Sequence, residues 1–193
     1  MNKILYDPTG ETNSVFRKPQ SLPTNLWDKK VMLFDIGKPR SKEFLDYFEE
    51  NLRQKGLVPK RAAKPTNAKT ATQEVIDFMV KEADVVIGAL SDWGSCTSCG
   101  LHDFNELDKN GIPGVFLVTE EFQDAASIQC KALGFEPAIY WMTHSVQNRT
   151  PEELRQMAKE AAEGVLEMMT SNTWIAQAIK KMSESSVSIL SGI

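Results

Sequence analysis

Five short apolar stretches alternate with amphipathic stretches along most of this 193-residue chain, and this alternation constrains its fold more than any other feature. The apolar stretches predict strands, because they are four to eight residues long and rich in β-branched and aromatic side chains. They cover residues 30–36, 57–62, 84–90, 113–119 and 137–142. Helical spacing of apolar residues predicts helices over 41–56, about 70–83, about 96–110 and about 121–133, and from 151 onward. Strands that alternate with helices in this way form a parallel sheet covered on both faces.

We therefore predict an α/β protein with a doubly wound, mostly parallel five-stranded sheet of flavodoxin or Rossmann type. The sheet and its helices would occupy residues 30–171 as a single domain. An N-terminal arm, residues 1–29, precedes this domain, and a C-terminal helical tail, residues 172–193, follows it. Both segments carry apolar side chains that need cover, so we expect them to pack on a neighbouring subunit in a homo-oligomer or in a complex with a homologous subunit.

Charge and hydropathy argue against two classes of partner, which are nucleic acids and membranes. The net charge is -4 and the pI is near 5.3, with lysines and arginines scattered among acidic residues, so we expect no nucleic-acid binding. No window approaches the roughly 18 apolar residues of a spanning helix, and the amino terminus lacks the apolar run of a secretion signal. We expect a cytoplasmic protein, whose three cysteines do not suggest a disulfide framework.

The loops that follow the predicted strands are the expected ligand site, because ligands of doubly wound sheets bind beyond the carboxyl ends of the strands. The loop after the first strand offers Asp35, Lys38 and Arg40, the loop after the fourth offers Glu120, and the loop after the fifth offers His144. Two flexible cations at this rim favour a small polar or anionic substrate.

The loop after the third strand, "SDWGSCTSCGLHD", carries the most chemistry. A helix that begins near Cys96 would place this thiol at a helix amino terminus, where N–H groups and the helix dipole favour the thiolate. Cys99 follows one turn later, so the C-x-x-C pair could cycle between dithiol and disulfide. His102 comes one turn further, and Cys96, Cys99 and His102 could instead hold a transition-metal ion such as zinc, iron or copper. A third alternative is that Cys99 and His102 are ordinary packed residues, as we expect for Cys130.

Several motifs resemble those of the UGSC family, named for a selenocysteine or cysteine followed by Gly-Ser-Cys. They are "YDPTGE", "LFDIGKP", "KPT", "DVVIGALSDWGSCTS", "HD", "NGIPGVFLVTEEF" and "THS". More distantly, "GSCTSCG" followed by a helix and "GIP" resembles the selenoprotein B component of glycine, sarcosine, betaine and proline reductases. Those enzymes cleave carbon–heteroatom bonds reductively with a selenol or thiol. Both resemblances imply redox chemistry at this loop.

Trp93 departs from the family pattern, since it stands where the resemblance implies a selenocysteine or cysteine. A decoding artefact is one explanation, because the selenocysteine codon UGA is one base from the tryptophan codon UGG. A true loss of the nucleophile is the second explanation, with Cys96 and Cys99 retained as the redox pair or as ligands. The third is a noncatalytic subunit beside a competent homologue, with Trp93 filling a pocket or an interface.

The sequence thus predicts a thiol-dependent oxidoreductase or reductive lyase, regenerated by a thiol reductant. We assign Cys96 as nucleophile, Cys99 as resolving thiol and His144 or His102 as general acid. The residues expected to line the substrate are Asp35, Lys38, Arg40, Trp93, Gly94, Ser95, Thr97 and Glu120. The alternatives are a metal-binding enzyme and a subunit of a hetero-oligomeric complex.

Overall fold

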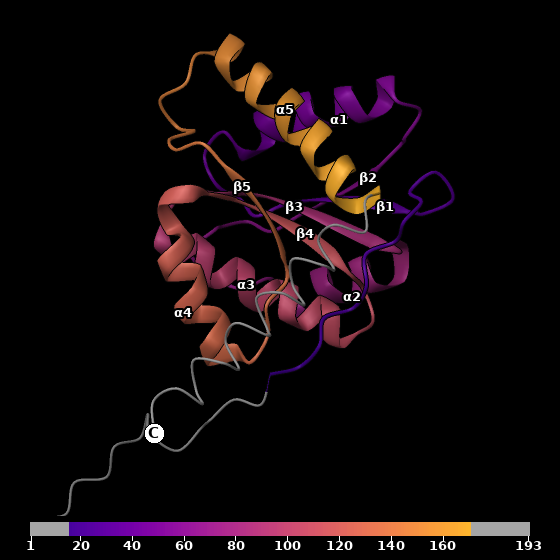
Figure 1. Ribbon diagram of the computed structural model, residues 1–193, viewed down its shortest axis with the longest axis vertical. Coiled ribbons are helices and arrows are strands. Elements are labelled where there is room, and N and C mark those ends of the chain that lie inside the picture. The colour runs from indigo at the N-terminus through magenta and orange to yellow at the C-terminus, as the bar shows by residue number, and fades with distance from the viewer. Residues whose placement is uncertain (1–15, 171–193) are drawn as a thin grey trace, which may run out of the picture.

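A computed structural model describes residues 16–170, which form one five-stranded parallel sheet between two helical layers (Figure 1). The strands are β1 (Val31–Asp35), β2 (Lys60–Ala63), β3 (Val85–Ser91), β4 (Gly114–Thr119) and β5 (Ala138–Met142). Their order in the sheet is β2-β1-β3-β4-β5, and every neighbouring pair is parallel. This is the flavodoxin-like order, so the predicted doubly wound α/β fold is confirmed.

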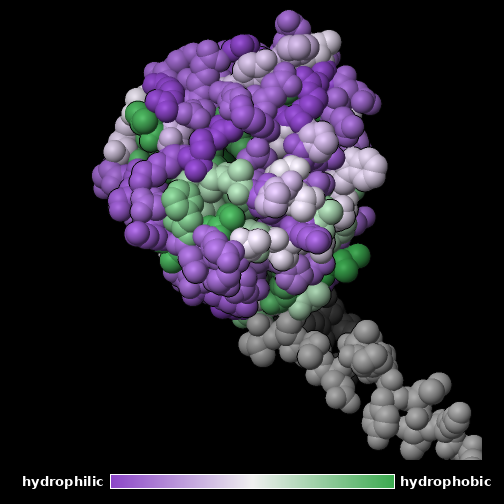
Figure 2. All heavy atoms as spheres, turned by 180° about the vertical axis from the view of Figure 1, so that it is seen from behind, coloured by the Kyte–Doolittle hydropathy of each residue, from purple (hydrophilic) through white to green (hydrophobic). Residues whose placement is uncertain are grey.

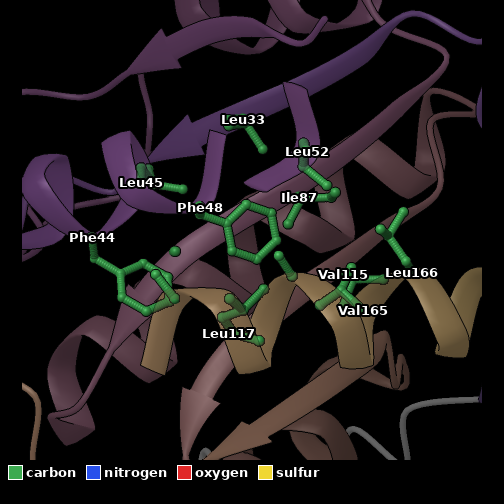
Figure 3. Packing of buried hydrophobic residues seen from close by; sticks show 14 of the residues in the cluster. Leu33, Phe44, Leu45, Phe48, Leu52, Ile87, Val115, Leu117, Val165 and Leu166 are labelled. Carbon is green, nitrogen blue, oxygen red and sulfur yellow. The ribbon is translucent and has the colours of Figure 1, made fainter. Parts of the chain in front are cut away.

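Helices α1 (Ser41–Gln54) and α5 (Pro151–Thr170) cover one face of the sheet. The other face carries α2 (Gln73–Glu82), α3 (Gly94–Lys109) and α4 (Gln123–Leu133), with a short 3₁₀ turn at Glu120–Phe122 before α4. Each layer encloses its own apolar core. In the first core, Phe48 of α1 lies between the sheet residues Leu33 and Ile87, and Phe44 lies one turn away on the same helix (Figure 3).

The predicted start of the last helix is confirmed by its cap. Thr150 Oγ1 accepts a hydrogen bond from the Glu153 N–H at 3.2 Å, and Glu153 Oε2 accepts one from the Thr150 N–H at 2.8 Å. This reciprocal pair is a capping box, and Pro151 occupies the first helical position, where no N–H is needed. The box fixes the residue at which α5 begins.

Helix α3 begins at Gly94, whereas the sequence predicted a start near Cys96. Trp93 is the cap residue, with extended backbone angles of φ −147° and ψ 154°, and its carbonyl accepts the first helical hydrogen bond from the Thr97 N–H at 3.0 Å. Cys96 is therefore the third residue of the helix, inside its first turn.

Close packing of α3 on the sheet depends on glycines beneath Phe104. A Cβ atom at Gly88 of β3 or at Gly114 of β4 would lie 2.7 or 2.6 Å from the Phe104 ring. The same ring stacks on Phe116 of β4 at 5.1 Å between centroids. In turn Phe116 packs over Gly100 of α3, where an added Cβ would lie 2.2 Å from the ring. These contacts fix the height of α3 above the sheet, and with it the place of the cysteine loop.

The described part of the predicted N-terminal arm, residues 16–29, packs partly on its own domain, whereas Phe16 and Trp27 are exposed. The expectation that the arm covers a neighbouring subunit stays a prediction. Leu22 and Leu26 are buried in the core between α1, α5 and the sheet. Arg17 pairs with Asp108 of α3 and lies over the Phe135 ring, 4.7 Å from its centroid. The buried leucines and the contacts of Arg17 attach residues 16–29 to the domain.

The rest of the arm and the predicted C-terminal tail lie outside the described residues. Within residues 16–170, no helix is long and apolar enough to cross a membrane. The back of the molecule is mostly polar, with small separate apolar patches (Figure 2).

Candidate functional site

The loops after β1 and β3 meet where the strand order reverses. From β1 the chain crosses to β2 on one side of the sheet, whereas β3 is followed by β4 on the other side. Residues 36–40 therefore diverge from residues 92–93, and the crevice between them is the usual ligand position in a doubly wound sheet. The cysteine loop lies at this switch point, as the sequence predicted.

A buried ion pair bridges the two loops. Lys38 from the β1 loop pairs with Asp92, the first residue after β3, and the two side chains are 4% and 1% exposed. The Lys38 ammonium also lies 5.1 Å from the ring centroid of Trp93 in a cation–π contact. Lys38 is thus at the predicted rim, but a carboxylate partner already accompanies it.

The first turn of α3 presents the exposed surface of the site. Trp93 is 60% exposed, and Gly94 and Ser95 are also exposed. An added Cβ at Gly94 would meet nothing within 4 Å, so the space above this turn is open. The free N–H groups of a first turn and the positive end of the helix dipole favour an anion there.

Cys96 is fully buried directly beneath this exposed turn. Its thiol donates a hydrogen bond to the Trp93 carbonyl at 3.0 Å, and Ser91 Oγ lies 3.3 Å from its sulfur. Thr97 is buried too, and its hydroxyl donates to the same carbonyl at 2.8 Å. This burial opposes the attacking role assigned to Cys96, and Thr97 lies below the surface that a substrate would touch.

Cys99 is the more accessible of the two loop thiols, because its side chain is only half-buried. Burial raises the pKa of Cys99, the Lys64 ammonium lowers it, and the charges of Asp103 and Cys96 raise it. Cys99 is therefore the more accessible thiol, whereas the sequence assigned the attacking role to Cys96 and the resolving role to Cys99.

A second buried ion pair supports the cysteine turn of α3. Lys64, just after β2, donates to Asp103 Oδ2 at 2.5 Å and to the Lys69 carbonyl at 2.8 Å. Burial raises the pKa of Asp103, against the lowering effects of Lys64 and of the Ala71 N–H that it accepts at 2.7 Å. This pair ties the loop between β2 and α2 to α3.

Two predicted substrate residues serve the loop's own structure. Asp35 accepts from the Gly37 N–H at 2.8 Å and from the Ser41 hydroxyl at 2.6 Å. Arg40 pairs with Glu43 at 3.0 Å and donates to the Arg149 carbonyl. Their polar atoms brace the first loop, so Lys38 is the predicted rim cation that remains next to the cysteine turn.

The two histidines lie in different places. His144 is exposed at the carboxyl end of β5, and its Nδ1 lies 3.1 Å from the buried Thr119 hydroxyl at the end of β4. Glu120 is exposed beside Thr119. His102 instead lies at the interface of α3 and α4, with its Nε2 3.3 Å from Gln129 Nε2. Only His144 belongs to the edge that holds the switch point.

Cys96, Cys99 and His102 do not form the metal site that the sequence offered as an alternative. Within residues 16–170, no three His, Cys, Asp or Glu side chains gather so that they could hold a metal ion. The reason is the helical arrangement: Cys96 faces the core, whereas His102 is exposed toward α4.

Sequence reasoning missed Ser91, Asp92 and Lys64 as members of this region. Asp92 and Lys64 are joined to partners far along the chain, which no local pattern reveals. The burial of Cys96 did have a signal, since Cys96, Gly100, Phe104 and Leu107 recur at helical spacing and form the buried face of α3.

The fold and the site together define a flavodoxin-type α/β protein with a thiol-bearing helix start at its switch point. The chain belongs to the UGSC family, whose model matches residues 4–171. The more distant resemblance to selenoprotein B stays a prediction. No curated protein matches the chain.

Two solved structures are similar to the chain at low identity. The flavodoxin-like domain of a Synechococcus protein is 13% identical, with a TM-score of 0.43, and the match covers 77% of this chain and 99% of that domain. The lactose-specific IIB component domain of the phosphotransferase system from Streptococcus pneumoniae is also 13% identical, with a TM-score of 0.30, and covers 72% and 94%.

Proposed function

We propose that this chain is a thiol-dependent oxidoreductase that acts on a small anionic substrate at the switch point between β1 and β3. A reductive lyase of the same thiol chemistry is included in this proposal. In it, position 93 is the attacking position of the fold and Cys96 is the buried partner thiol. This reverses the predicted role of Cys96, from nucleophile to resolving thiol.

The observation that carries the proposal is the contrast between two residues three positions apart. Residue 93 is exposed at the cap of α3, and Cys96 is buried below it with its sulfur 3.0 Å from the carbonyl oxygen of residue 93. A two-step thiol cycle needs the resolving thiol within reach of the attacking sulfur, and positions 93 and 96 have the C-x-x-C spacing at a helix start that provides this. A substrate anion would lie over the open turn at Gly94 and Ser95, and His144 would supply a proton to the leaving group.

Trp93 has no sulfur, so the chain as it stands must rely on its own two loop thiols. Cys99 would attack and Cys96 would resolve, with C-x-x-C spacing between them. We expect this cycle to be slow, because burial raises the pKa of Cys99 and so lowers its thiolate fraction at neutral pH.

The first prediction is that Trp93→Cys raises thiol-dependent turnover of hydrogen peroxide at least about tenfold, with dithiothreitol as reductant. The new thiolate would attack peroxide and form a sulfenic acid with release of water. The Cys96 thiol would then condense with it, releasing a second water and forming a disulfide that dithiothreitol reduces. Coupled consumption of peroxide and dithiothreitol measures the cycle.

Trp93→Ser is the matched control, since it removes the indole without adding a thiol, and it should leave turnover at the level of the natural chain. The second substitution Cys96→Ser in the Trp93→Cys chain should lower steady-state turnover again. Equal rates for Trp93→Cys and Trp93→Ser would contradict the role of position 93.

A noncatalytic subunit is the second candidate function, and the exposure of Trp93 favours it. An indole that is 60% exposed does not fill its own core, whereas tryptophan is enriched at the centre of protein interfaces. The partner would be a homologous subunit that carries the nucleophile. A Trp93→Cys chain that stays inert would favour this function over the first.

A further inference from the structure

Cations at the carboxyl edge of the sheet differ in what they contact. Three cationic side chains there, besides Lys38, are held by loop carbonyls and by acidic partners that brace the loops. They are Arg40, with Glu43 and the Arg149 carbonyl; Lys64, with Asp103 and the Lys69 carbonyl; and Arg149, with the carbonyls of His144 and Ser145 and with Glu153. Lys38 alone of the four contacts residue 93.

Like Lys64, Lys38 is buried. Its side chain is 4% exposed, and in the described part of the chain its contacts are the carboxylate of Asp92 and the Trp93 ring. A buried ammonium is stabilised by negative charge or by the electron-rich face of an aromatic ring. Within residues 16–170, Asp92 Oδ1 pairs with the Lys38 ammonium and has no other hydrogen-bond partner.

We infer that Lys38 is the cation that stabilises a negatively charged sulfur or selenium atom at position 93, and that the indole of Trp93 replaces this anion by offering its ring face to the same ammonium. The inference rests on the proposed function, because it names the residue that activates the attacking position. The inference also explains why tryptophan is tolerated at position 93. An indole cannot perform the chemistry of a selenolate, but it can satisfy the cation beside it.

Other charged and titratable groups face position 93 from the elements that meet there. Asp92 adjoins it at the end of β3 and would oppose a negative charge, while the start of α3 favours one through its dipole. The Cys96 thiol lies below, bonded to the carbonyl of residue 93. Lys38 is the cation of this set, so its removal should have the largest effect on a thiol at position 93.

The test measures the pKa of that thiol in the full-length Trp93→Cys chain. Iodoacetamide labels the protein over a series of pH values, and mass spectrometry of the peptide that holds position 93 gives its alkylation rate. Adding Lys38→Gln should raise the pKa of the thiol by about one unit or more, as expected when an opposite charge within about 6 Å is lost. Lys38→Arg keeps the charge and should keep the pKa low.

Lys42→Gln is the matched control, because it removes the same charge from an exposed lysine of α1 that pairs with Asp46. It should shift the pKa by no more than a few tenths of a unit. A Lys38→Gln shift no larger than this, or a loss of the low pKa in Lys38→Arg, overturns the inference.

Lys38→Gln leaves Asp92 without its cation and could unfold the chain. The comparison of Asp92→Asn with Lys38→Gln/Asp92→Asn, both in the Trp93→Cys background, then isolates Lys38, and the double variant should have the higher pKa. Alkylation needs no turnover. If the pKa of the thiol at position 93 depends on Lys38 but the Trp93→Cys chain turns over no peroxide, only the proposed function is refuted. If the chain turns over peroxide but the pKa does not depend on Lys38, only this inference is refuted.

Discussion

Accessibility separates the three cysteines in a way that their spacing does not. Cys96 and Cys130 are buried, whereas Cys99, one turn after Cys96, is half-buried. Spacing alone favoured Cys96 because it is nearer to the helix start. The contact of the helix with the sheet decides which side chain is shielded, and that contact depends on distant residues.

At this scale we predict that Cys99 reacts with iodoacetamide before Cys96 and Cys130 in the folded natural chain. The reagent must reach the sulfur, and the half-buried thiol is the one that it can reach. Because burial raises the pKa of Cys99, its rate should keep rising with pH well above neutrality. Peptide mass spectrometry after timed labelling gives the order, with the unfolded chain in guanidinium chloride as the control in which all three react alike. Faster labelling of Cys96 would restore the role that its spacing suggested.

The elements of the fold were largely predictable, whereas the arrangement of the site was not. Strands such as β3 are continuous apolar runs, and the start of α5 carries a complete capping box, so both were visible in the sequence. The pairs Lys38–Asp92 and Lys64–Asp103 join residues 54 and 39 positions apart, and local patterns hold no information about them. The position of the candidate site was predictable because loops at the carboxyl ends of parallel strands share one edge of the sheet, but its contacts depend on tertiary packing.

Packing between α3 and β4 provides the element-scale prediction. Gly100→Ala should destabilise the protein by about 1–3 kcal/mol, because the added methyl group would press on the buried Phe116 ring, which is already stacked on Phe104. Urea denaturation followed by circular dichroism measures the change in the free energy of unfolding.

Gly94→Ala is the matched control in the same helix, since a methyl group there meets nothing within 4 Å. Alanine is the better helix former, so this variant should be as stable as the natural chain or slightly more stable. A similar loss of stability in both variants would mean that the tight contact at Gly100 does not decide the outcome.

For the whole molecule, the described residues before the first strand, 16–29, contribute Leu22 and Leu26 to the core of the domain. These two leucines pack in the core between α1, α5 and the sheet. The sequence showed isolated apolar residues without periodicity, and such residues do not reveal which surface they cover. Assembly into an oligomer stays a prediction, with light scattering as its measurement.

We predict that Leu26→Ala costs about 2–5 kcal/mol of stability, the usual range for a buried leucine. The neighbouring Trp27→Ala is the control: Trp27 is 59% exposed and its side chain donates one hydrogen bond, from Nε1 to the Lys55 carbonyl at 3.2 Å. Its loss should cost about 1 kcal/mol or less. Thermal unfolding of the two variants compares them, and an unaffected Leu26→Ala chain would show that this segment is dispensable for the core.

The contact between Phe104 and Gly88 also bears on how this family can change over evolutionary time. A Cβ at position 88 would lie 2.7 Å from the ring, so one position holds a large side chain only because the other holds none. Volume lost at one site can be regained at the other, but an intermediate sequence with bulk at both is strained and one with bulk at neither has a void. The two positions should therefore vary together among relatives, with a small side chain at 104 wherever 88 is no longer glycine. A change of side chain at this contact therefore needs two substitutions, and the sequence with only one of them is less stable. The exposed cap residue at position 93 can be replaced by a single substitution.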